Sequence, residues 1–508
     1  MSRQRQVLLI GLTKYGSVMI GKSGLYRILP TAIALSLVIL LVAPAWGDGC
    51  FTIVVGKDAS ADGYVIMAHN EDDSPPQVVN HLKIPHISHR PGQKVKLLNG
   101  GEVDQVEETW EYIWSEMPGM LFSDSYLNQW GVCIASDRCP SREDNPDITN
   151  GGISYMLRRL VVERAKSSRE GVKIAGELVE RFGYDSSGRT YIICDPQEGW
   201  LFCAINGKHW LAQRVPDDEV AMVANSYTVH GVDLSDTLNF LGSSDVIEYS
   251  ISRGWYDPEK DGSFDFASVY SDPFAASDSV NFCRQWGGLR HVSSDKIALN
   301  QELPFSVKPE QKLDAGAVMQ ILRDHFEGTD LYRYSHETGS PHERTFHSIC
   351  NSTTQTSSVV QLRGDMPLDI GIVYWVCLGP PCTSFFIPFH FGITKFPDGF
   401  YTQEEMPSME AYDERVESPF EADILQAFYT FSNFYHKIDD AYRDKIGRFQ
   451  IELEEFEKNA LALQKNVEQS AMELYTLDKS KAREILTNYS NGLYLSAMEA
   501  MNQVLSEK

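Results

Sequence analysis

Residues 50–72 read CFTIVVGKDASADGYVIMAHNED, and this stretch decides what kind of fold the chain adopts. Residues 51–55 and 64–68 are rich in β-branched, aromatic and other apolar side chains, which favour strands. The segment between them, residues 57–63, consists of turn-forming residues. Two such runs joined by a turn predict a β-hairpin. Cys50 stands directly before the first predicted strand, so the hairpin begins next to a thiol.

The chain upstream of Cys50 has the pattern of an export signal. Residues 1–27 carry basic but no acidic side chains, residues 28–43 form an apolar run, and Ala43, Ala45 and Gly47 supply small residues for cleavage. This order is typical of a secretory signal peptide. The apolar run is shorter than the roughly 20 residues of a membrane-spanning helix, and a retained signal anchor is the alternative. We therefore predict that residues 1–49 are removed and that the protein is secreted or periplasmic, without stable membrane association after processing.

The composition and net charge of the chain indicate which kinds of molecule it can bind. The 508 residues are 43% hydrophobic and 23% charged, which is typical of a globular protein. The formal net charge is −25, and removal of residues 1–49 makes it more negative because that segment is mainly basic. An acidic surface repels phosphate backbones, so we predict no nucleic-acid partner. Homo-oligomer formation stays open.

Further strands and helices are predicted in alternating blocks downstream. We expect strands at residues 131–136, 190–195, 200–205, 220–224 and 370–378, and helices at 154–166, 170–182 and near 315–326. This mixture favours an α+β fold on a mostly antiparallel sheet. Apolar side chains recur at helical spacing from residue 419 onward. We therefore predict that residues 416–508 form a C-terminal helical extension packed on the main domain.

Cys50 is the candidate nucleophile. If processing exposes it as the first residue, it carries a thiol and a free α-amine together. An α-amine titrates near pH 8, so its neutral form can take the proton of the thiol. The thiolate can then attack an amide carbonyl and form an acyl-enzyme, provided that fixed donors hold the oxyanion. The alternative is a structural or disulfide-bonded cysteine.

The order of residues from Cys50 to Asp72 resembles the start of the mature dipeptidases of peptidase family C69, which are N-terminal nucleophile hydrolases. The residues that carry the resemblance are Cys50, the turn at 55–63, and Ala68-His69-Asn70-Glu71-Asp72. The wider group, which includes bile-salt hydrolases and penicillin V acylases, usually has Arg where this chain has His69. Three later segments, at residues 125–132, 216–226 and 347–381, are also similar to the family.

The resemblance implies a four-layer αββα sandwich over residues 50–415 and a set of site residues. Asp72 would bind the amine or thiol of Cys50, and Asn225 would donate to the oxyanion. Arg363 would bind the substrate carboxylate, with His69 and Asn70 of the motif also on the substrate-binding side. The alternatives are that Asp72 closes a turn, that Asn225 caps a loop and that Arg363 is a surface charge.

The remaining cysteines and histidines do not predict a cofactor. Eight cysteines besides Cys50 allow up to four disulfides in an exported chain, or they stay as buried thiols. His81, His86 and His89 lie close together without a zinc spacing. Residues 257–268 begin like a calcium loop but have Ser268 where the ion needs a bidentate Glu. We therefore predict no metal and no cofactor.

The sequence thus favours an exported cysteine dipeptidase that hydrolyses short unblocked peptides through an acyl-enzyme on Cys50. One alternative keeps the mechanism but acts on another acyl-amide, such as a conjugated bile salt or a penicillin. The other is a secreted binding protein on the same fold without catalytic activity, because a fold does not guarantee a function.

Overall fold

The computed structural model describes residues 49–73, 79–116, 123–293, 297–299, 301–342, 347–401 and 426–506. The predicted signal segment, apart from Gly49, lies outside these ranges, as does the start of the predicted C-terminal extension. Within the described ranges, no helix combines the length and the apolar character that a bilayer crossing requires.

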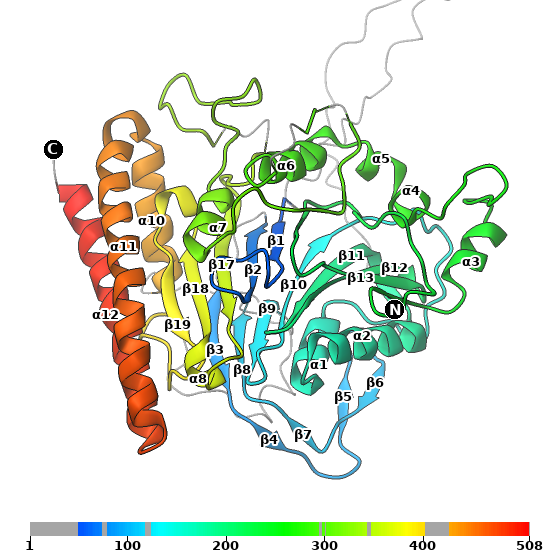
Figure 1. The fold of residues 1–508 in the computed structure, drawn as a ribbon, viewed down its shortest axis with the longest axis horizontal. Coiled ribbons are helices and arrows are strands. Elements are labelled where there is room, and N and C mark those ends of the chain that lie inside the picture. Colours follow the sequence, from blue (N-terminus) through cyan, green and yellow to red (C-terminus); the bar gives the residue numbers. More distant parts are fainter. Residues whose placement is uncertain are drawn as a thin grey trace, which may run out of the picture. The chain divides into compact units, whose positions relative to one another are not determined.

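Two large antiparallel sheets form the centre of the described residues (Figure 1). The predicted hairpin that follows Cys50 lies in the middle of the first sheet, which has seven strands. In spatial order these are β16 (Ser306–Val307), β14 (Val220–Val223), β1 (Phe51–Val55), β2 (Val65–Asp72), β17 (Thr354–Leu362), β18 (Ile372–Leu378) and β19 (Ile387–His390).

The second sheet has eight strands among the described residues. In spatial order they are β15 (Phe240–Gly242), β13 (Trp210–Arg214), β12 (Gly199–Gly207), β11 (Tyr184–Cys194), β10 (Cys133–Arg138), β9 (Ser123–Asn128), β8 (Tyr112–Glu116) and β3 (Asn80–Ile84). Two short hairpins pair β4 (Ile87–Ser88) with β7 (Glu108–Thr109) and β5 (Lys94–Lys96) with β6 (Glu102–Asp104).

Helices cover the outer faces of both sheets. The eight-stranded sheet is covered by α1 (Met156–Arg164) and α2 (Ser168–Phe182). The seven-stranded sheet is covered by α6 (Ser279–Leu289), α7 (Ala315–Leu322), α10 (Ala427–Asp439) and α12 (Lys479–Ser506). Helix α11 (Tyr442–Tyr475) packs on α12. The shorter helices are α3 (Val246–Ser252), α4 (Phe266–Tyr270), α5 (Pro273–Ala276), α8 (Leu368–Gly371) and the 3₁₀ turn η1 (Pro381–Thr383).

The layer order follows from alternating side chains on the strands. Successive residues of a strand point to opposite faces of the sheet. On β11, Ile192 packs in the core between the two sheets, together with Val54 of β1, whereas its neighbour Ile193 packs in the core beneath α1 and α2. Helix, sheet, sheet and helix therefore follow one another, which confirms the predicted four-layer αββα sandwich.

The predicted hairpin is confirmed as β1 and β2. The two strands pair antiparallel from Phe51 opposite Asn70 to Val55 opposite Ile66. The turn between them needs its glycines, because Gly63 has a φ of 77° and a Cβ on Gly56 would lie 2.4 Å from the carbonyl oxygen of Asp217. Because β1 also pairs with β14, it lies between β14 and β2 in the sheet.

Several predicted elements differ from the structure in their bounds, and two of them show the physical reason. The strand predicted at residues 370–378 begins at Ile372, because the amides of Ile370 and Gly371 both donate to the carbonyl of Pro367 and close the turn of α8. The helix predicted near 315–326 ends at Leu322, and Phe326 has a φ of 66°, which no helix tolerates. Both corrections come from tight turns at the ends of elements.

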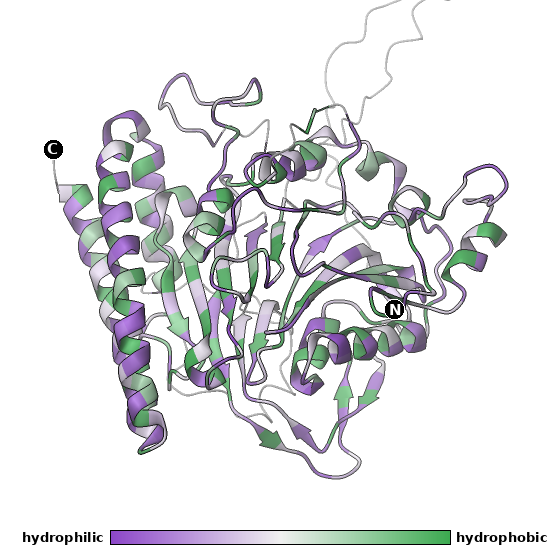
Figure 2. Cartoon of the chain, in the orientation of Figure 1, coloured by the Kyte–Doolittle hydropathy of each residue, from purple (hydrophilic) through white to green (hydrophobic). Residues whose placement is uncertain are grey.

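The C-terminal helices are amphipathic. Hydrophilic and hydrophobic residues alternate along α11 and α12, whereas the central strands are mostly hydrophobic (Figure 2). The aromatic side chains Phe449 and Phe456 of α11 pack edge-on against Phe385, which follows η1. The apolar side chains that recur at helical spacing in these helices therefore pack in the core. All nine cysteines are buried, and none forms a disulfide in the part of the chain that the structure describes.

Candidate active site

Cys50 lies at the entry to β1, almost completely buried. The β1–β2 register places it opposite Glu71, at the end of β2. Its Sγ lies 3.4 Å from Oε2 of Glu71 and 3.7 Å from the carbonyl oxygen of Asp72. The thiol is thus held against the end of one central strand by the pairing of the hairpin.

His69 connects this thiol group to the second sheet. Its Nε2 lies 3.2 Å from the same oxygen of Glu71, and its Nδ1 lies 2.8 Å from Oγ1 of Thr52. Thr52 in turn donates to Asp137 of β10 at 2.5 Å. Burial raises the pKa of Asp137 to about 6. A continuous polar chain therefore runs from Cys50 through Glu71 and His69 to a buried carboxyl.

Asp72 lies beside the residue that precedes Cys50. A Cβ built on Gly49 would lie 3.0 Å from Oδ2 of Asp72 and 3.4 Å from Nδ1 of His347. The same oxygen of Asp72 accepts a hydrogen bond from Nδ2 of Asn351 at 2.6 Å. Burial raises the pKa of Asp72 to about 7. The carboxyl that the motif predicts near the amine thus faces the peptide bond that processing would cut.

Arg284 of α6 binds the backbone on both sides of that peptide bond. Its Nη1 donates to the carbonyl oxygens of Gly49 and of Cys50, the latter at 3.0 Å. Its Nη2 donates to Oδ1 of Asn225 at 2.9 Å and to Oδ1 of Asn281 at 2.7 Å. Burial lowers the pKa of this guanidinium. Arg284 is therefore the centre of the site, although no motif pointed to it.

Asn225 is linked to Cys50 by Arg284, which donates hydrogen bonds to both residues. It follows β14 and has a φ of 55°, in the left-handed region that Asn tolerates better than most residues. Its Nδ2 donates to the carbonyl oxygen of Arg138 at 3.0 Å. One of the two N–H groups of the amide that the resemblance assigns to the oxyanion is thus bonded to a backbone carbonyl.

Asn70 and Arg363 lie away from the thiol. Asn70 is on the opposite face of β2 from His69, and its Nδ2 binds the carbonyl oxygens of Leu322 and Ile349 at 3.0 and 2.9 Å. Arg363 comes directly after Leu362, the last residue of β17, which pairs with Val65 at the start of β2. Val65 and Asp72 lie at opposite ends of β2, about 20 Å apart along the strand. The structure therefore does not bring these two side chains to Cys50.

Arg363 has a different set of partners. Its guanidinium forms a two-pronged ion pair with Glu468 of α11, with N···O distances of 2.8 and 2.5 Å. The pair lies largely buried, and Arg363 also donates to the carbonyl oxygen of Gly371 at 2.9 Å. This geometry fastens a C-terminal helix to the sheet.

Arg284 and Asn351 are among the residues of the site that sequence reasoning missed. The only local signal for Arg284 is a charge within the otherwise neutral segment 279–289, where a buried arginine requires partners. Asn351 lies within a segment similar to the family, but its partner Asp72 is 279 positions away. Chemically, the site holds a buried thiol, a carboxyl within reach of it, and a guanidinium on the adjoining carbonyls.

Comparisons with known proteins relate the chain to a family of peptidases. The sequence profile of peptidase family C69 matches residues 49–415. A probable dipeptidase of Salmonella dublin is 27% identical over 366 residues, covering 69% of this chain and 82% of the relative. Dipeptidase A of Lactobacillus helveticus is 23% identical over 371 residues, covering 70% of this chain and 77% of the relative.

A solved structure is also similar. A mutant of the conjugated bile acid hydrolase from Clostridium perfringens aligns with 65% of this chain and 89% of its own, at 14% identity and a TM-score of 0.33.

Proposed function

Because the chain belongs to peptidase family C69 and is therefore a peptide hydrolase, we propose that it is an exported cysteine dipeptidase with Sγ of Cys50 as its nucleophile. In this proposal residues 1–49 are removed, residues 50–415 form the catalytic domain, and residues 416–508 form a helical extension. The substrates are short unblocked peptides, as the names of the relatives suggest. One observation carries the proposal: the thiol of Cys50 is buried at the end of a central hairpin, against Glu71 and Asp72.

Removal of Gly49 would leave the α-amine of Cys50 in the space between Asp72 and Arg284. The carboxylate of Asp72 favours a cation at this place, while the guanidinium of Arg284 disfavours a second positive charge. Neutral amine can then take the proton of the Cys50 thiol, so that one residue supplies nucleophile and base.

The thiolate attacks the carbonyl carbon of the substrate peptide bond, and the carbonyl oxygen becomes an oxyanion. We assign its stabilisation to cationic Arg284 and to Asn225, whose Nδ2 carries a second hydrogen besides the one donated to Arg138. Collapse breaks the C–N bond, and the α-ammonium of Cys50 gives its proton to the leaving amine. Water then attacks the thioester carbonyl and gives a proton to the α-amine of Cys50. The C–S bond breaks, the N-terminal amino acid of the substrate leaves with a free carboxyl group, and the proton returns to the thiolate.

The experiment is to purify the exported protein from its own host, determine its N-terminus and intact mass, and assay a dipeptide panel beside N-acyl amino acids. We expect a chain that begins at Cys50, hydrolyses several dipeptides and leaves the N-acyl compounds unchanged. A chain that begins elsewhere, or one that cleaves only the N-acyl compounds, contradicts the proposal. Hydrolysis that survives Cys50→Ala contradicts the assignment of the nucleophile.

A further inference from the structure

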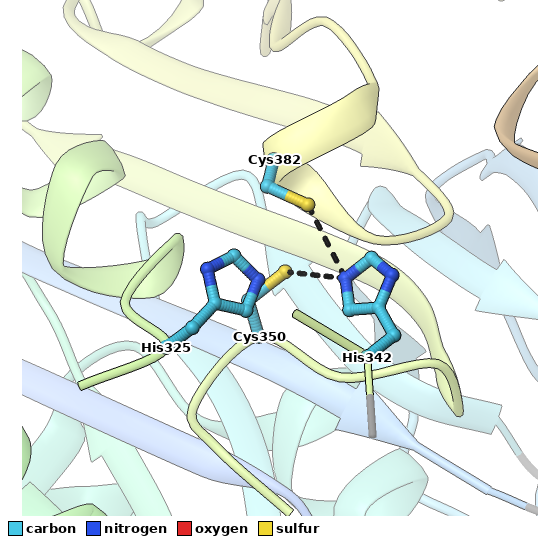
Figure 3. Close-up of side chains that lie close together, drawn as sticks. All are labelled: His325, His342, Cys350 and Cys382. Carbon is cyan, nitrogen blue, oxygen red and sulfur yellow. Dashed lines mark hydrogen bonds between the residues drawn. The ribbon is translucent and has the colours of Figure 1, made fainter. Parts of the chain in front are cut away.

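Four buried side chains outside the candidate active site meet at one point. They are His325, His342, Cys350 and Cys382, and one nitrogen or sulfur atom from each lies within 4.8 Å of the others (Figure 3). Nε2 of His342 lies 3.3 Å from Sγ of Cys382 and 3.8 Å from Sγ of Cys350. In a tetrahedral zinc site, Zn–S bonds of about 2.3 Å and Zn–N bonds of about 2.0 Å place neighbouring ligand atoms roughly 3.3–3.8 Å apart.

Both imidazoles are oriented by carboxylates that lie outside the cluster. Nδ1 of His325 is 2.8 Å from Oε1 of Glu327, and Nδ1 of His342 is 2.8 Å from Oδ1 of Asp439 on α10. An ionised carboxylate only accepts hydrogen bonds, so each Nδ1 carries a proton, and Nε2 is the nitrogen that a neutral imidazole would offer to a metal ion. A carboxylate behind a histidine is the usual arrangement around a protein-bound zinc ion.

Nε2 of His342 has hydrogen-bond partners in the two sulfur atoms, but the second histidine differs. Nε2 of His325 is buried and makes no hydrogen bond of normal geometry among the described residues. A buried polar atom without a partner costs free energy, and so does a buried unpaired charge. A divalent ion bound by two thiolates and two neutral imidazoles gives a site with no net charge. Binding would release the two thiol protons to solvent.

We propose that His325, His342, Cys350 and Cys382 bind a structural Zn²⁺ ion. Four protein ligands close the coordination shell, which is typical of a structural site rather than of a catalytic one. No sequence pattern indicated this site, because the ligands do not stand in the close pairs that mark most zinc motifs. The proposal does not depend on the proposed peptidase function.

The position of the site gives the ion a role in the fold. Cys350 precedes Asn351, which donates to Asp72, and follows Ile349, whose carbonyl accepts from Asn70. Cys382 lies in η1, and Asp439 belongs to α10. The ion would therefore join the segment that contacts the end of β2 to the edge of the sheet and to the C-terminal helices.

The test measures metal in the full chain, purified without an affinity tag or chelator. We expect a single zinc ion per chain by elemental analysis, and its loss in the double variant Cys350→Ser/Cys382→Ser. The control Cys203→Ser changes another buried thiol, on β12, and should keep the zinc. Replacement by Co²⁺ should give the absorption bands of a tetrahedral thiolate site. Zinc retained by the double variant overturns the proposal.

A second measurement uses only the unaltered chain and so does not depend on the folding of a variant. Alkylation followed by peptide mapping should label Cys350 and Cys382 only after a chelator has removed the ion. A protein without metal, in which these two residues form a disulfide and the intact mass falls by two hydrogens, overturns the proposal. So does labelling of both residues that is the same with and without chelator.

Discussion

Asn351 donates its side-chain amide to Asp72 across 2.6 Å, although 279 positions separate the two residues in sequence. The contact exists because β17, which begins at Thr354, pairs with β2 so that Thr354 lies opposite Asp72. Asp72 is therefore a buried carboxyl with fixed partners at the end of the hairpin. Its pKa reflects a competition between burial, which favours the neutral acid, and hydrogen bonds, which favour the carboxylate.

The first prediction concerns Asp72 in the unprocessed Cys50→Ala chain, which keeps Gly49. The pKa of Asp72 is raised from 3.8 to about 7, so the folded state binds more protons than the unfolded state in this range. The contribution of the Asp72 carboxyl to the free energy of unfolding is therefore fully present below about pH 4, and it is lost as the pH rises through about 7. Adding Asp72→Asn should remove this part of the pH dependence in urea unfolding, whereas Asp398→Asn, an exposed control, should not.

The second prediction concerns the thiol. Replacing Cys50 by Ala in a chain that still folds should lower kcat/KM for dipeptides by at least about a thousandfold, because the nucleophile is lost. Replacing Cys203 by Ser removes a buried thiol that is not part of this site and should leave kcat/KM within a few-fold. Steady-state kinetics on processed protein of verified N-terminus separates the two cases. Equal losses in both variants would point to a folding defect.

The third prediction concerns Arg284. Replacing it by Met leaves the carbonyls of Gly49 and Cys50 and the amide oxygen of Asn225 without this donor, at about 1–3 kcal/mol for each buried group. We expect lower stability and an accumulation of chain that still carries Gly49, visible by intact mass. The control Arg253→Met removes an arginine that pairs with Glu143 and Asp144. Normal processing of Arg284→Met would contradict this role.

The fourth prediction concerns Arg363. Because it is paired with Glu468, Arg363→Gln should destabilise the protein by about 3 kcal/mol and leave KM for dipeptides nearly unchanged. An exposed pair gives the control, since Lys395→Gln should change stability by less than about 1 kcal/mol. A large increase in KM at unchanged stability would instead support the substrate-binding role that the resemblance implies.

The elements that the sequence predicted well are those whose information is local. The β1–β2 hairpin, the strands that contain Ile192 and Leu201, and the amphipathic C-terminal helices each have a periodic pattern over a few turns or strand residues. Their bounds were less secure, as at Ile372 and Leu322, because hydrogen bonds in a tight turn end an element irrespective of hydrophobic periodicity.

By itself, the sequence determined the hairpin that begins at Cys50, the αββα class through its resemblance to a family, and the motif that contains His69 and Asp72. Only the tertiary structure decided which distant side chains complete the site. It placed Arg284 on the carbonyl of Cys50, 234 positions away, and moved Arg363 to an ion pair with a C-terminal helix. It also brought together His325, His342, Cys350 and Cys382, whose positions in the sequence follow no metal-binding motif. The physical reason is that strand pairing and helix packing join segments in space, and no local pattern records which polar groups then meet.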